Sequence, residues 1–244
     1  MASQPLSDKS ALVTGGSRRI GRTIALTLAN AGADVTITYR ASKDEAKQLV
    51  GTMEGLGRRA LALECDVRSE SSVRAAIDEV ISYHGCLDVL INNAAVFESA
   101  PIDKISVEQW DAVFETNVRG PFLVAREALQ HLRAAHGKIV NIGSLGGIHA
   151  WAGHAHYCSS KAALHMLTQA MAKAFAPEVS VNCVAPGWIE FAGEDGEAAK
   201  RFAAKTPMKR NGTVEDVAQA VLSFATSSSF VIGQILTVDG GLGL

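Results

Sequence analysis

Short apolar segments alternate with longer segments of helical periodicity along almost the whole chain, and this alternation limits the fold more than any other feature. The predicted strands are Ser10–Thr14, Asp34–Tyr39, Arg59–Cys65, Leu87–Ile91, Lys138–Ile142, Ser180–Val184 and Ile235–Val238. The predicted helices are Arg19–Ala31, Ser42–Leu56, Ser69–His84, Val107–Ala134, His156–Phe175 and Val214–Ala225. Continuous apolar strands are buried on both faces, and crossover helices imply parallel pairing. The sequence therefore predicts an α/β fold, a doubly wound and mostly seven-stranded parallel sheet.

Length and composition fit one domain of this kind. The chain has 244 residues, 48% of them hydrophobic, which is enough for a single large core over residues 1–244. The net charge is −2 and no basic stripe is present, so nucleic acid is not an expected partner. Residues 1–9 are polar and no run of about 18 apolar residues occurs, so neither a signal peptide nor a membrane span is expected. The four cysteines form no Cys-x-x-Cys pair, which favours a reducing, cytoplasmic setting.

A glycine turn joins the first predicted strand to the first predicted helix. Residues 15–21 read Gly-Gly-Ser-Arg-Arg-Ile-Gly. Such a turn lets the backbone approach a pyrophosphate, which the helix N-terminus stabilises. A tight turn without a ligand is the alternative, but the place of the turn in the chain favours a nucleotide. Arg18 and Arg19 oppose the helix dipole at this end, which suits a neighbouring phosphate.

The end of the second predicted strand indicates which dinucleotide to expect. An acidic residue there would hydrogen-bond the ribose 2′-hydroxyl of NAD, whereas an arginine suits a 2′-phosphate. Residues 38–42 read Thr-Tyr-Arg-Ala-Ser and contain no Asp or Glu. Arg40, followed by Ser42, therefore predicts NADP(H).

Tyr157 and Lys161 lie one helical turn apart in the predicted helix 156–175. Side chains at positions i and i+4 are about 5–6 Å apart on one face. We therefore expect the Lys161 ammonium to lower the pKa of the Tyr157 phenol, which is ordinarily about 10. A tyrosine tuned in this way can donate a proton to an oxygen that gains a hydride. Alone, Tyr-x-x-x-Lys is more often a solvated pair, so this interpretation depends on the other motifs.

A set of motifs in a fixed order resembles the short-chain dehydrogenase/reductase family along nearly the whole chain. The matching segments are Thr14–Gly21 (the glycine turn, with Arg19 in place of the usual middle glycine), Cys65–Val67, Asn92–Ala95, Thr116–Val118, Ile142–Ser144, Tyr157 with Lys161, Pro186–Gly187 and Val238–Gly241. Any one of them is common by chance. Their joint occurrence in this order is specific to the family.

The resemblance implies a Rossmann domain that transfers a hydride from NADP(H) to a carbonyl or C=N group. It implies that Tyr157 is the proton donor and that Lys161 tunes it and holds the nicotinamide ribose. Ser144 would stabilise the developing anion, and Asn117 would hold a water that returns the proton through Lys161. Taken singly, Ser144 could be a strand-end serine satisfied by backbone and Asn117 a helix-kink residue. The residues expected to bind NADP(H) are Gly15, Ser17, Arg18, Arg19, Ile20, Gly21, Arg40, Ser42, Asp66, Val67, Asn93, Ala94, Tyr157, Lys161, Pro186, Gly187 and, through its backbone, Ile189.

Two branches of the family remain open for the substrate. Arg19, residues 39–42 and Phe97 resemble the pteridine reductases, in which Phe97 would stack on the pterin; packing under a lid is the alternative. Ser144, the chain length and the C-terminal segment also resemble 3-oxoacyl-(acyl-carrier-protein) reductases and many sugar or alcohol dehydrogenases. The aspartate of the pteridine reductases has no equivalent that we can place. Phe191 follows Pro186–Gly187 where the family usually has a threonine that contacts the nicotinamide carboxamide.

Residues 187–210 form a candidate lid, because they mix Gly, acidic and basic residues after a Pro-Gly turn. The expected substrate residues are Phe97, His154, Trp188 and Phe191, with Trp151 beside them. Residues 194–205 are expected to be a solvated helix face. His149, His154 and His156 lack a cysteine or carboxylate at ligand spacing, so no metal is expected.

Two further expectations concern assembly and the class of function. The resemblance implies a homo-oligomer, a dimer or tetramer, that pairs the long helices 107–134 and 156–175. A protein that senses NADP(H) without turnover is the alternative to an enzyme. The complete set of Ser144, Tyr157 and Lys161 argues against it, since a sensor needs no proton donor.

Overall fold

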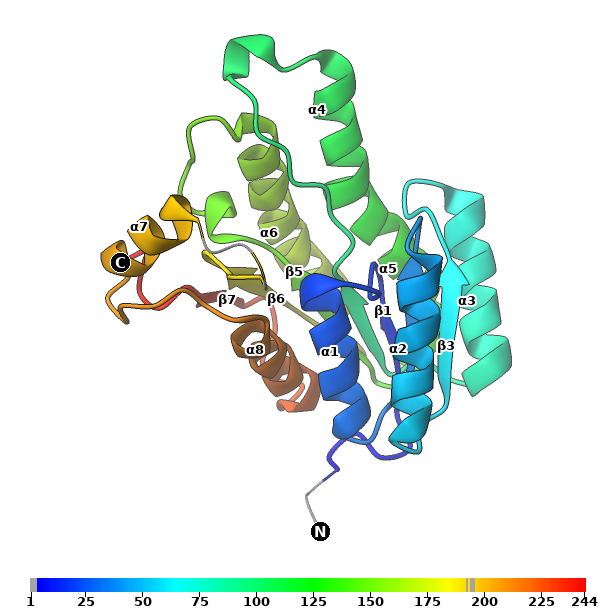
Figure 1. Ribbon diagram of the computed structural model, residues 1–244. Helices are drawn as coiled ribbons and strands as arrows, with labels where there is room; N and C mark the ends of the chain where they lie inside the picture. The colour runs from blue at the N-terminus through cyan, green and yellow to red at the C-terminus, as the bar shows by residue number, and fades with distance from the viewer. Residues whose placement is uncertain (1–3, 192, 194–195) are drawn as a thin grey trace.

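The central sheet has the predicted doubly wound, parallel form (Figure 1). The computed structural model describes residues 4–191, 193 and 196–244. Within these residues, seven parallel strands lie in the order β3-β2-β1-β4-β5-β6-β7. They are β1 (Ser10–Val13), β2 (Asp34–Tyr39), β3 (Ala60–Glu64), β4 (Val89–Asn92), β5 (Lys138–Ile142), β6 (Ser180–Pro186) and β7 (Ile235–Val238). The strand order reverses between β1 and β4, and a crevice therefore opens beyond the carboxyl ends of these strands.

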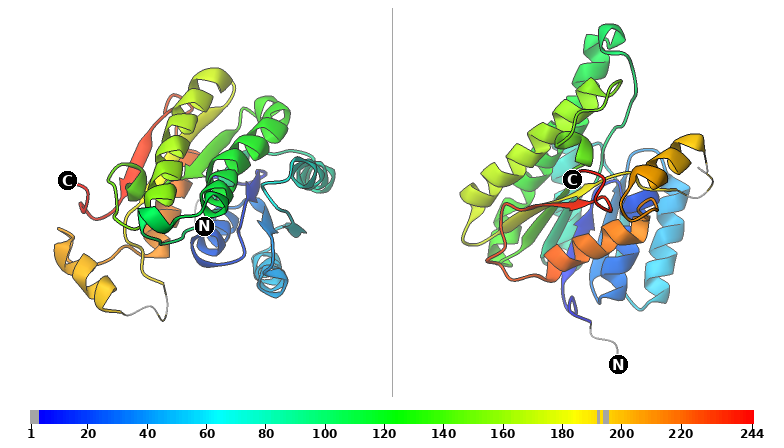
Figure 2. Two further views of the ribbon diagram at one scale, coloured as in Figure 1. Left: turned by 90° about the horizontal axis from the view of Figure 1, so that it is seen from above. Right: turned by 90° about the vertical axis from the view of Figure 1, so that its left-hand side faces the viewer.

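Helices cover both faces of the sheet (Figures 1 and 2). One layer contains α1 (Arg19–Asn30), α2 (Lys43–Gly55) and α8 (Val214–Thr226), and the other contains α3 (Glu70–His84), α5 (Gly120–Ala134) and α6 (Ala155–Phe175). Each helix turns a row of apolar side chains toward the strands, as Ile24, Ala25 and Leu28 do in α1. No helix in the described part of the chain is long and apolar enough to cross a membrane.

The predicted continuous helix over 107–134 is wrong in one respect. It is divided into α4 (Val107–Phe114) and α5 by a π-helical turn, η2 (Glu115–Arg119). The turn carries Asn117 inward, where its side chain pairs with both main-chain polar groups of Val96. A π turn inserts one extra residue and often marks a functional site. The local sequence signal is Gly120–Pro121, since proline lacks the N–H that a regular helix would use.

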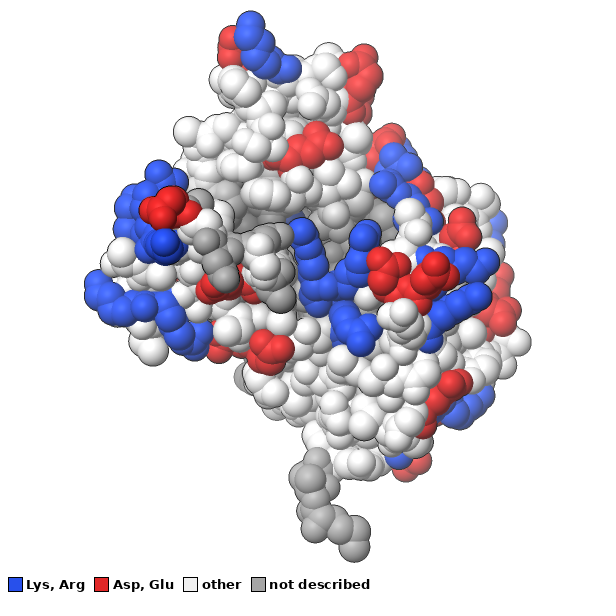
Figure 3. Space-filling view, in the orientation of Figure 1, with Lys and Arg blue, Asp and Glu red and all other residues white. Residues whose placement is uncertain are grey.

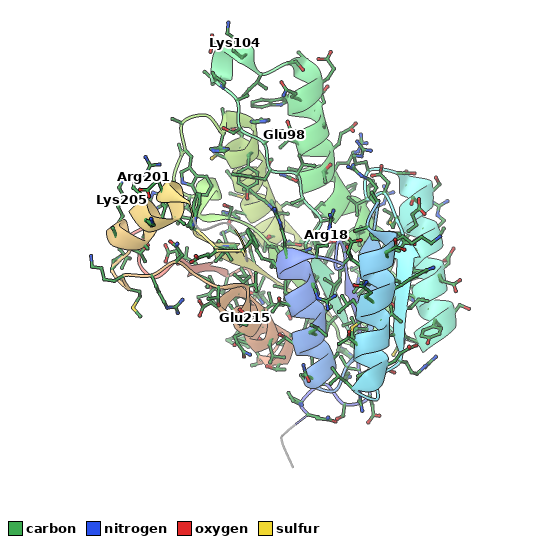
Figure 4. All side chains as sticks on the ribbon, viewed as in Figure 1. Arg18, Glu98, Lys104, Arg201, Lys205 and Glu215 are labelled. Carbon is green, nitrogen blue, oxygen red and sulfur yellow. The ribbon has the colours of Figure 1, made fainter. Side chains whose placement is uncertain are left out.

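The candidate lid between β6 and α8 contains a short helix, α7 (Glu197–Lys205), at the side of the molecule in Figure 1. Its Lys200, Arg201 and Lys205 face away from the sheet, and Figure 4 shows Arg201 and Lys205 pointing outward. Ala199 is buried, so the helix is amphipathic rather than solvated all round. Ala192, Glu194 and Asp195, which belong to the predicted lid, lie outside the described residues. Two short 3-10 turns, η1 (Ile102–Lys104) and η3 (Leu145–Gly147), complete the chain.

A buried chain of side-chain hydrogen bonds holds β4, β5 and α6 in register. The Asn92 amide donates to the Asn141 carbonyl oxygen at 2.8 Å, and the Asn141 amide donates to the Thr168 hydroxyl at 2.8 Å. Thr168 in turn donates to the Leu164 carbonyl at 2.8 Å. Buried polar groups are stable only when they are paired in this way. These hydrogen bonds therefore fix the position of α6 relative to the end of β5.

Replacing Thr168 with valine keeps the side-chain shape but leaves the Asn141 amide buried without its acceptor. We expect the free energy of unfolding to fall by about 1–3 kcal/mol, measured by urea denaturation. Thr52→Val is the matched control, because the Thr52 hydroxyl makes a similar bond to the Gln48 carbonyl on an exposed helix surface. Equal losses of unfolding free energy in the two variants would contradict the claim that the buried hydrogen bonds of Asn92, Asn141 and Thr168 stabilise the fold.

Candidate active site

The glycine turn after β1 is tightly enclosed by its neighbours. Gly15 has φ +61°, a conformation that favours glycine. A Cβ at Gly16 would lie 2.7 Å from Ile37, and a Cβ at Gly21 would lie 2.5 Å from the Asn93 amide nitrogen. Glycine is thus required for the turn to pass close to β2 and to the segment after β4. The resulting cradle of bare backbone suits a pyrophosphate.

Asn93 and Ala94 hold this turn in place. The Asn93 amide donates to the carbonyls of Thr14 and Gly15, both at 2.9 Å. The main-chain N–H groups of Asn93 and Ala94 donate to the Thr14 hydroxyl at 3.0 and 3.1 Å. Both residues were predicted to bind the dinucleotide, and the structure shows them shaping the turn that would do so. Thr14 itself was not singled out, because a strand-end threonine carries no signal of its partners.

Arg19 occupies the middle-glycine place with φ +50°. This left-handed conformation is costly for a residue with a side chain, which explains why the family usually has glycine there. The Arg19 guanidinium lies 4.7 Å from the centre of the Phe191 ring. Phe191 was predicted to face the substrate, and it instead packs beside the glycine turn, on the dinucleotide side of the crevice.

The first turn of α1 is open to an anion. In the described residues, no side chain caps this helix and none of its first-turn residues is acidic. Its leading N–H groups and positive dipole end are therefore suited to a phosphate. Arg18 is exposed at this end, 3.8 Å from Glu45 across to α2. Figure 3 shows basic side chains gathered beside a hollow at the centre of this face, and Figure 4 places Arg18 there.

The end of β2 adds groups suited to a second phosphate. Arg40 follows β2 and is exposed. The hydroxyls of Ser17 and Ser42 bond each other at 2.5 Å, which joins the glycine turn to the start of α2. Both serines are buried, and the prediction that these residues and Arg40 hold a 2′-phosphate stays a prediction.

Asp66, the predicted adenine-contacting acid, already has a strong partner. Arg68 donates to both of its carboxylate oxygens, at 2.6 to 3.1 Å, and holds the pKa of Asp66 to about 2. Arg40 adds a smaller lowering of the same pKa. Arg68 could not be recognised from sequence, because it pairs only through the turn after β3. Val67 is buried and lies against Gly120, so any contact to a nucleotide would come from its backbone.

Ser144, Tyr157 and Lys161 come together at the carboxyl end of β5. Ser144 follows the strand after Gly143, and its hydroxyl oxygen accepts the Gly146 N–H at 3.0 Å. The Lys161 ammonium is buried and donates to the Ile142 carbonyl at 2.8 Å. It lies 5.7 Å from the centre of the Tyr157 ring. The structure therefore assembles the three residues that the sequence predicted as a set.

The prediction that Lys161 lowers the pKa of Tyr157 is wrong. Burial raises the pKa of Tyr157 to about 12, and only the hydrogen bond with Ser144 opposes this rise. The Lys161 ammonium is directed at the Ile142 carbonyl, and its own burial lowers the pKa of Lys161 to about 8. At neutral pH the phenol is thus fully protonated, the form that can donate a proton.

Asn117 acts as a clamp. Its amide nitrogen donates to the Val96 carbonyl and to the Ser160 hydroxyl, both at 3.0 Å, and its oxygen accepts the Val96 N–H at 2.8 Å. Ser160 in turn donates to the Tyr157 carbonyl at 2.7 Å. The side chain therefore links the segment after β4 to the helix that carries Tyr157. With both amide donors engaged, the predicted water-holding role stays a prediction.

Aromatic rings surround the Tyr157 phenol. Phe97, which is 59% exposed, meets the Tyr157 ring edge-on at 4.8 Å and stacks on His154 at 4.8 Å. Trp151 stacks on Tyr157 at 6.3 Å. His154 also bonds the Glu98 carbonyl at 2.9 Å through Nδ1. The predicted substrate residues Phe97 and His154 thus lie beside the candidate proton donor, together with Trp151.

The turn after β6 forms the opposite wall of the crevice. A Cβ at Gly187 would lie 2.7 Å from the Asp239 side chain, so glycine is needed for this close approach after Pro186. Ile189 pairs with Gly212 in a short parallel bridge, in which Trp188 and Glu190 make the hydrogen bonds. The N–H and the carbonyl of Ile189 itself therefore take no part in the hydrogen bonds of this bridge. Trp188 stacks on Phe202 of α7 at 4.2 Å.

The three neighbouring histidines do not converge. His149 bonds the Gly243 carbonyl, His154 bonds the Glu98 carbonyl, and buried His156 lies 3.9 Å from the Glu98 carboxylate. Among the described residues, no group of three or more His, Cys, Asp or Glu side chains is arranged to hold a metal ion.

Comparison with known proteins shows the family of the chain. The model of the family described as enoyl-(acyl carrier protein) reductase matches residues 15–243. The chain is 36% identical, over 96% of its length and 98% of the relative's, to the 3-oxoacyl-[acyl-carrier-protein] reductase FabG of Staphylococcus aureus. It is 35% identical to the short chain dehydrogenase mdpC of Emericella nidulans, over 97% and 96% of the two chains.

Solved structures show the same fold. A short chain dehydrogenase from Burkholderia cenocepacia in complex with NADP is 38% identical, with a TM-score of 0.93 over 98% of this chain and 100% of that one. A blue fluorescent protein from a metagenomic library in complex with NADPH is 35% identical, with a TM-score of 0.93 over the same shares. The chain belongs to the short-chain dehydrogenase/reductase family. It is an oxidoreductase that uses a nicotinamide dinucleotide.

The raised pKa of Tyr157 predicts a specific titration. The phenolate absorbance of the wild type minus that of Tyr157→Phe is expected to titrate at about 12, because burial disfavours the anion. Tyr83→Phe, on α3 and away from Ser144 and Lys161, serves as the control for the loss of a phenol elsewhere in the protein. A Tyr157 phenolate that forms at or below about 10 would contradict the account.

Proposed function

We propose that this protein is an NADPH-dependent reductase that transfers a hydride to a carbonyl or C=N group, with Tyr157 as the proton donor. The observation that carries the proposal is the convergence of Tyr157, Ser144 and Lys161 at the carboxyl end of β5. This place borders the glycine turn, across the reversal point of the sheet. A sensor of NADP(H) would have no use for a half-buried phenol next to a serine hydroxyl.

The residues of the crevice fit NADPH. The glycine turn admits no side chain at Gly16 or Gly21, and the uncapped start of α1 suits the pyrophosphate. Arg40 and Arg18 would hold the 2′-phosphate, a role that a planar guanidinium fills well. The NADP and NADPH complexes of two structural relatives support this preference. When bound, the dinucleotide supplies the hydride.

The proton chemistry follows from the burial of two groups. Since the pKa of Tyr157 is raised to about 12, its phenol keeps its proton at neutral pH and can give it to the atom that becomes negative. The Ser144 oxygen accepts the Gly146 N–H, which leaves its O–H to donate to the same atom. Lys161, with a pKa of about 8, is able to gain or release a proton near neutral pH. It can thus reprotonate Tyr157.

Two substrate classes remain in the proposal. Similarity to the 3-oxoacyl-[acyl-carrier-protein] reductase favours a 3-oxoacyl thioester. The exposed Phe97 ring beside Tyr157 favours a flat heterocycle such as a pteridine, because aromatic rings stack on such groups. Residues 187–210 would act as the lid of the single domain, with Trp188, which stacks on Phe202 of α7, closing the substrate side.

Assembly into a dimer or tetramer is part of the proposal. An apolar groove lies between α5 and α6, lined by side chains that include Phe122, Leu129, Leu167 and Phe175. A second copy of the chain would cover it. The four cysteines are free thiols, which supports a cytoplasmic location.

Tyr157→Phe tests the reaction directly. NADPH absorbance is first followed with the wild type and a panel of dihydropterin, acetoacetyl thioester, quinone and simple ketone. On the best substrate, Tyr157→Phe is expected to lower kcat by at least about 100-fold, because the general acid is lost. NADPH binding, measured by fluorescence, should remain. Tyr83→Phe should behave as the wild type does. A Tyr157→Phe variant with wild-type kcat would rule out the mechanism, and binding without any turnover by the wild type would favour a sensor.

Arg40→Asp tests the choice of dinucleotide. Loss of a charge-assisted contact and gain of a like charge should weaken NADPH relative to NADH by about tenfold or more, measured as the ratio of kcat/KM values. Lys173→Asp makes the same charge change at an exposed position on α6 and should leave the ratio unchanged. An unchanged ratio in Arg40→Asp would show that another residue reads the phosphate.

A further inference from the structure

Three side chains form a row along α6 that faces the end of β5. Tyr157, Lys161 and His165 stand at successive i, i+4 positions, so they lie on one face of the helix. Lys161 donates to the Ile142 carbonyl, the Ser144 side chain lowers the pKa of Tyr157, and Nε2 of His165 accepts the Ser144 N–H. Two of the three were predicted from the family pattern. His165 was not, although the same spacing extended by one turn leads to it.

His165 is 5% exposed and wedged against the turn that carries Ser144. The Ser144 N–H donates to its Nε2 at 3.4 Å. A Cβ at Gly143 would overlap the same nitrogen, and a Cβ at Gly147 would lie 2.6 Å from Cε1. The imidazole ring fits here because neither glycine has a side chain. The ring therefore supports the strand end on both sides of Ser144.

The imidazole is held in the neutral form that this contact requires. A nitrogen that accepts a hydrogen bond must be unprotonated, which puts the proton on Nδ1. Burial, with a smaller effect from the positive charge of Lys161, lowers the pKa of His165 to about 4. His165 thus stays an acceptor through the neutral range.

We propose that His165 is a positioning residue of the reduction: its Nε2 holds the Ser144 main chain, so that the Ser144 hydroxyl stays aimed at the atom that Tyr157 protonates. The inference rests on the proposed reductive function, but its hydrogen bond can be tested without turnover. His165 does not reach the reacting atoms itself and acts only through Ser144.

The proposal predicts different results for two replacements. His165→Leu fills the space but leaves the Ser144 N–H buried without an acceptor, and kcat should fall by about tenfold, since a tenfold loss corresponds to roughly one such hydrogen bond. His165→Gln restores an acceptor at the place of Nε2 and should remain within about threefold of the wild type. KM for NADPH should change in neither variant. Met166→Leu, the exposed neighbour on α6, is the matched control.

A double-mutant cycle separates positioning from a general structural effect. In the Ser144→Ala background the hydroxyl is already gone, so His165→Leu should cost little further kcat. An equal loss in both backgrounds, or equal kcat values for His165→Leu and His165→Gln, would overturn the proposal.

Spectra of the wild-type protein with isotope-labelled histidine test the hydrogen bond independently of activity and of how the variants fold. The His165 signal, assigned by its loss in His165→Gln, should show a neutral ring with the proton on Nδ1 from about pH 5 to 8, where an ordinary histidine titrates. A charged ring at about pH 6, or a proton on Nε2, would refute the proposal. If the wild type reduces no substrate of the panel, the proposed function fails, and the state of this ring still decides whether His165 accepts from Ser144.

Discussion

The contact between α6 and the carboxyl end of β5 is the interaction on which the rest of the site depends. Lys161 is almost fully buried, and an ammonium removed from water needs an acceptor, which the Ile142 carbonyl provides. The buried chain from Asn92 through Asn141 to Thr168 fixes the same helix two turns further along. Because these polar bonds allow only one register, Tyr157 comes to lie beside Ser144.

The site has two parts: the proton-delivering groups, which the contact between α6 and β5 holds, and the aromatic rings beside them. In the proposed reaction, the serine hydroxyl is held by a buried hydrogen bond from the Gly146 N–H, and burial keeps the phenol protonated. The aromatic rings of Phe97 and Trp151 approach Tyr157 from loops. Such an arrangement lets the substrate change while the proton-delivering groups stay the same.

The sequence predicted the sheet well because buried parallel strands and crossover helices leave a local pattern. The order of the motifs predicted which three residues lie together at the end of β5, and their catalytic roles stay a prediction. What it could not show depends on contacts between distant segments. The π turn forms where Asn117 pairs with Val96, and the Phe191 ring packs against the Arg19 guanidinium beside the glycine turn. The pKa of Tyr157 was predicted with the wrong sign, because helical spacing gives the distance to Lys161 but not the burial that outweighs it.

The most direct test of the account is a crystal structure of the protein with NADP⁺ and the substrate that the panel identifies. The account predicts that the reducible oxygen or nitrogen lies about 2.6–3.2 Å from both the Tyr157 and the Ser144 hydroxyls. A bound substrate whose reacting atom reaches neither hydroxyl, and is instead held by another donor, would contradict the claim that Tyr157 delivers the proton beside the end of β5.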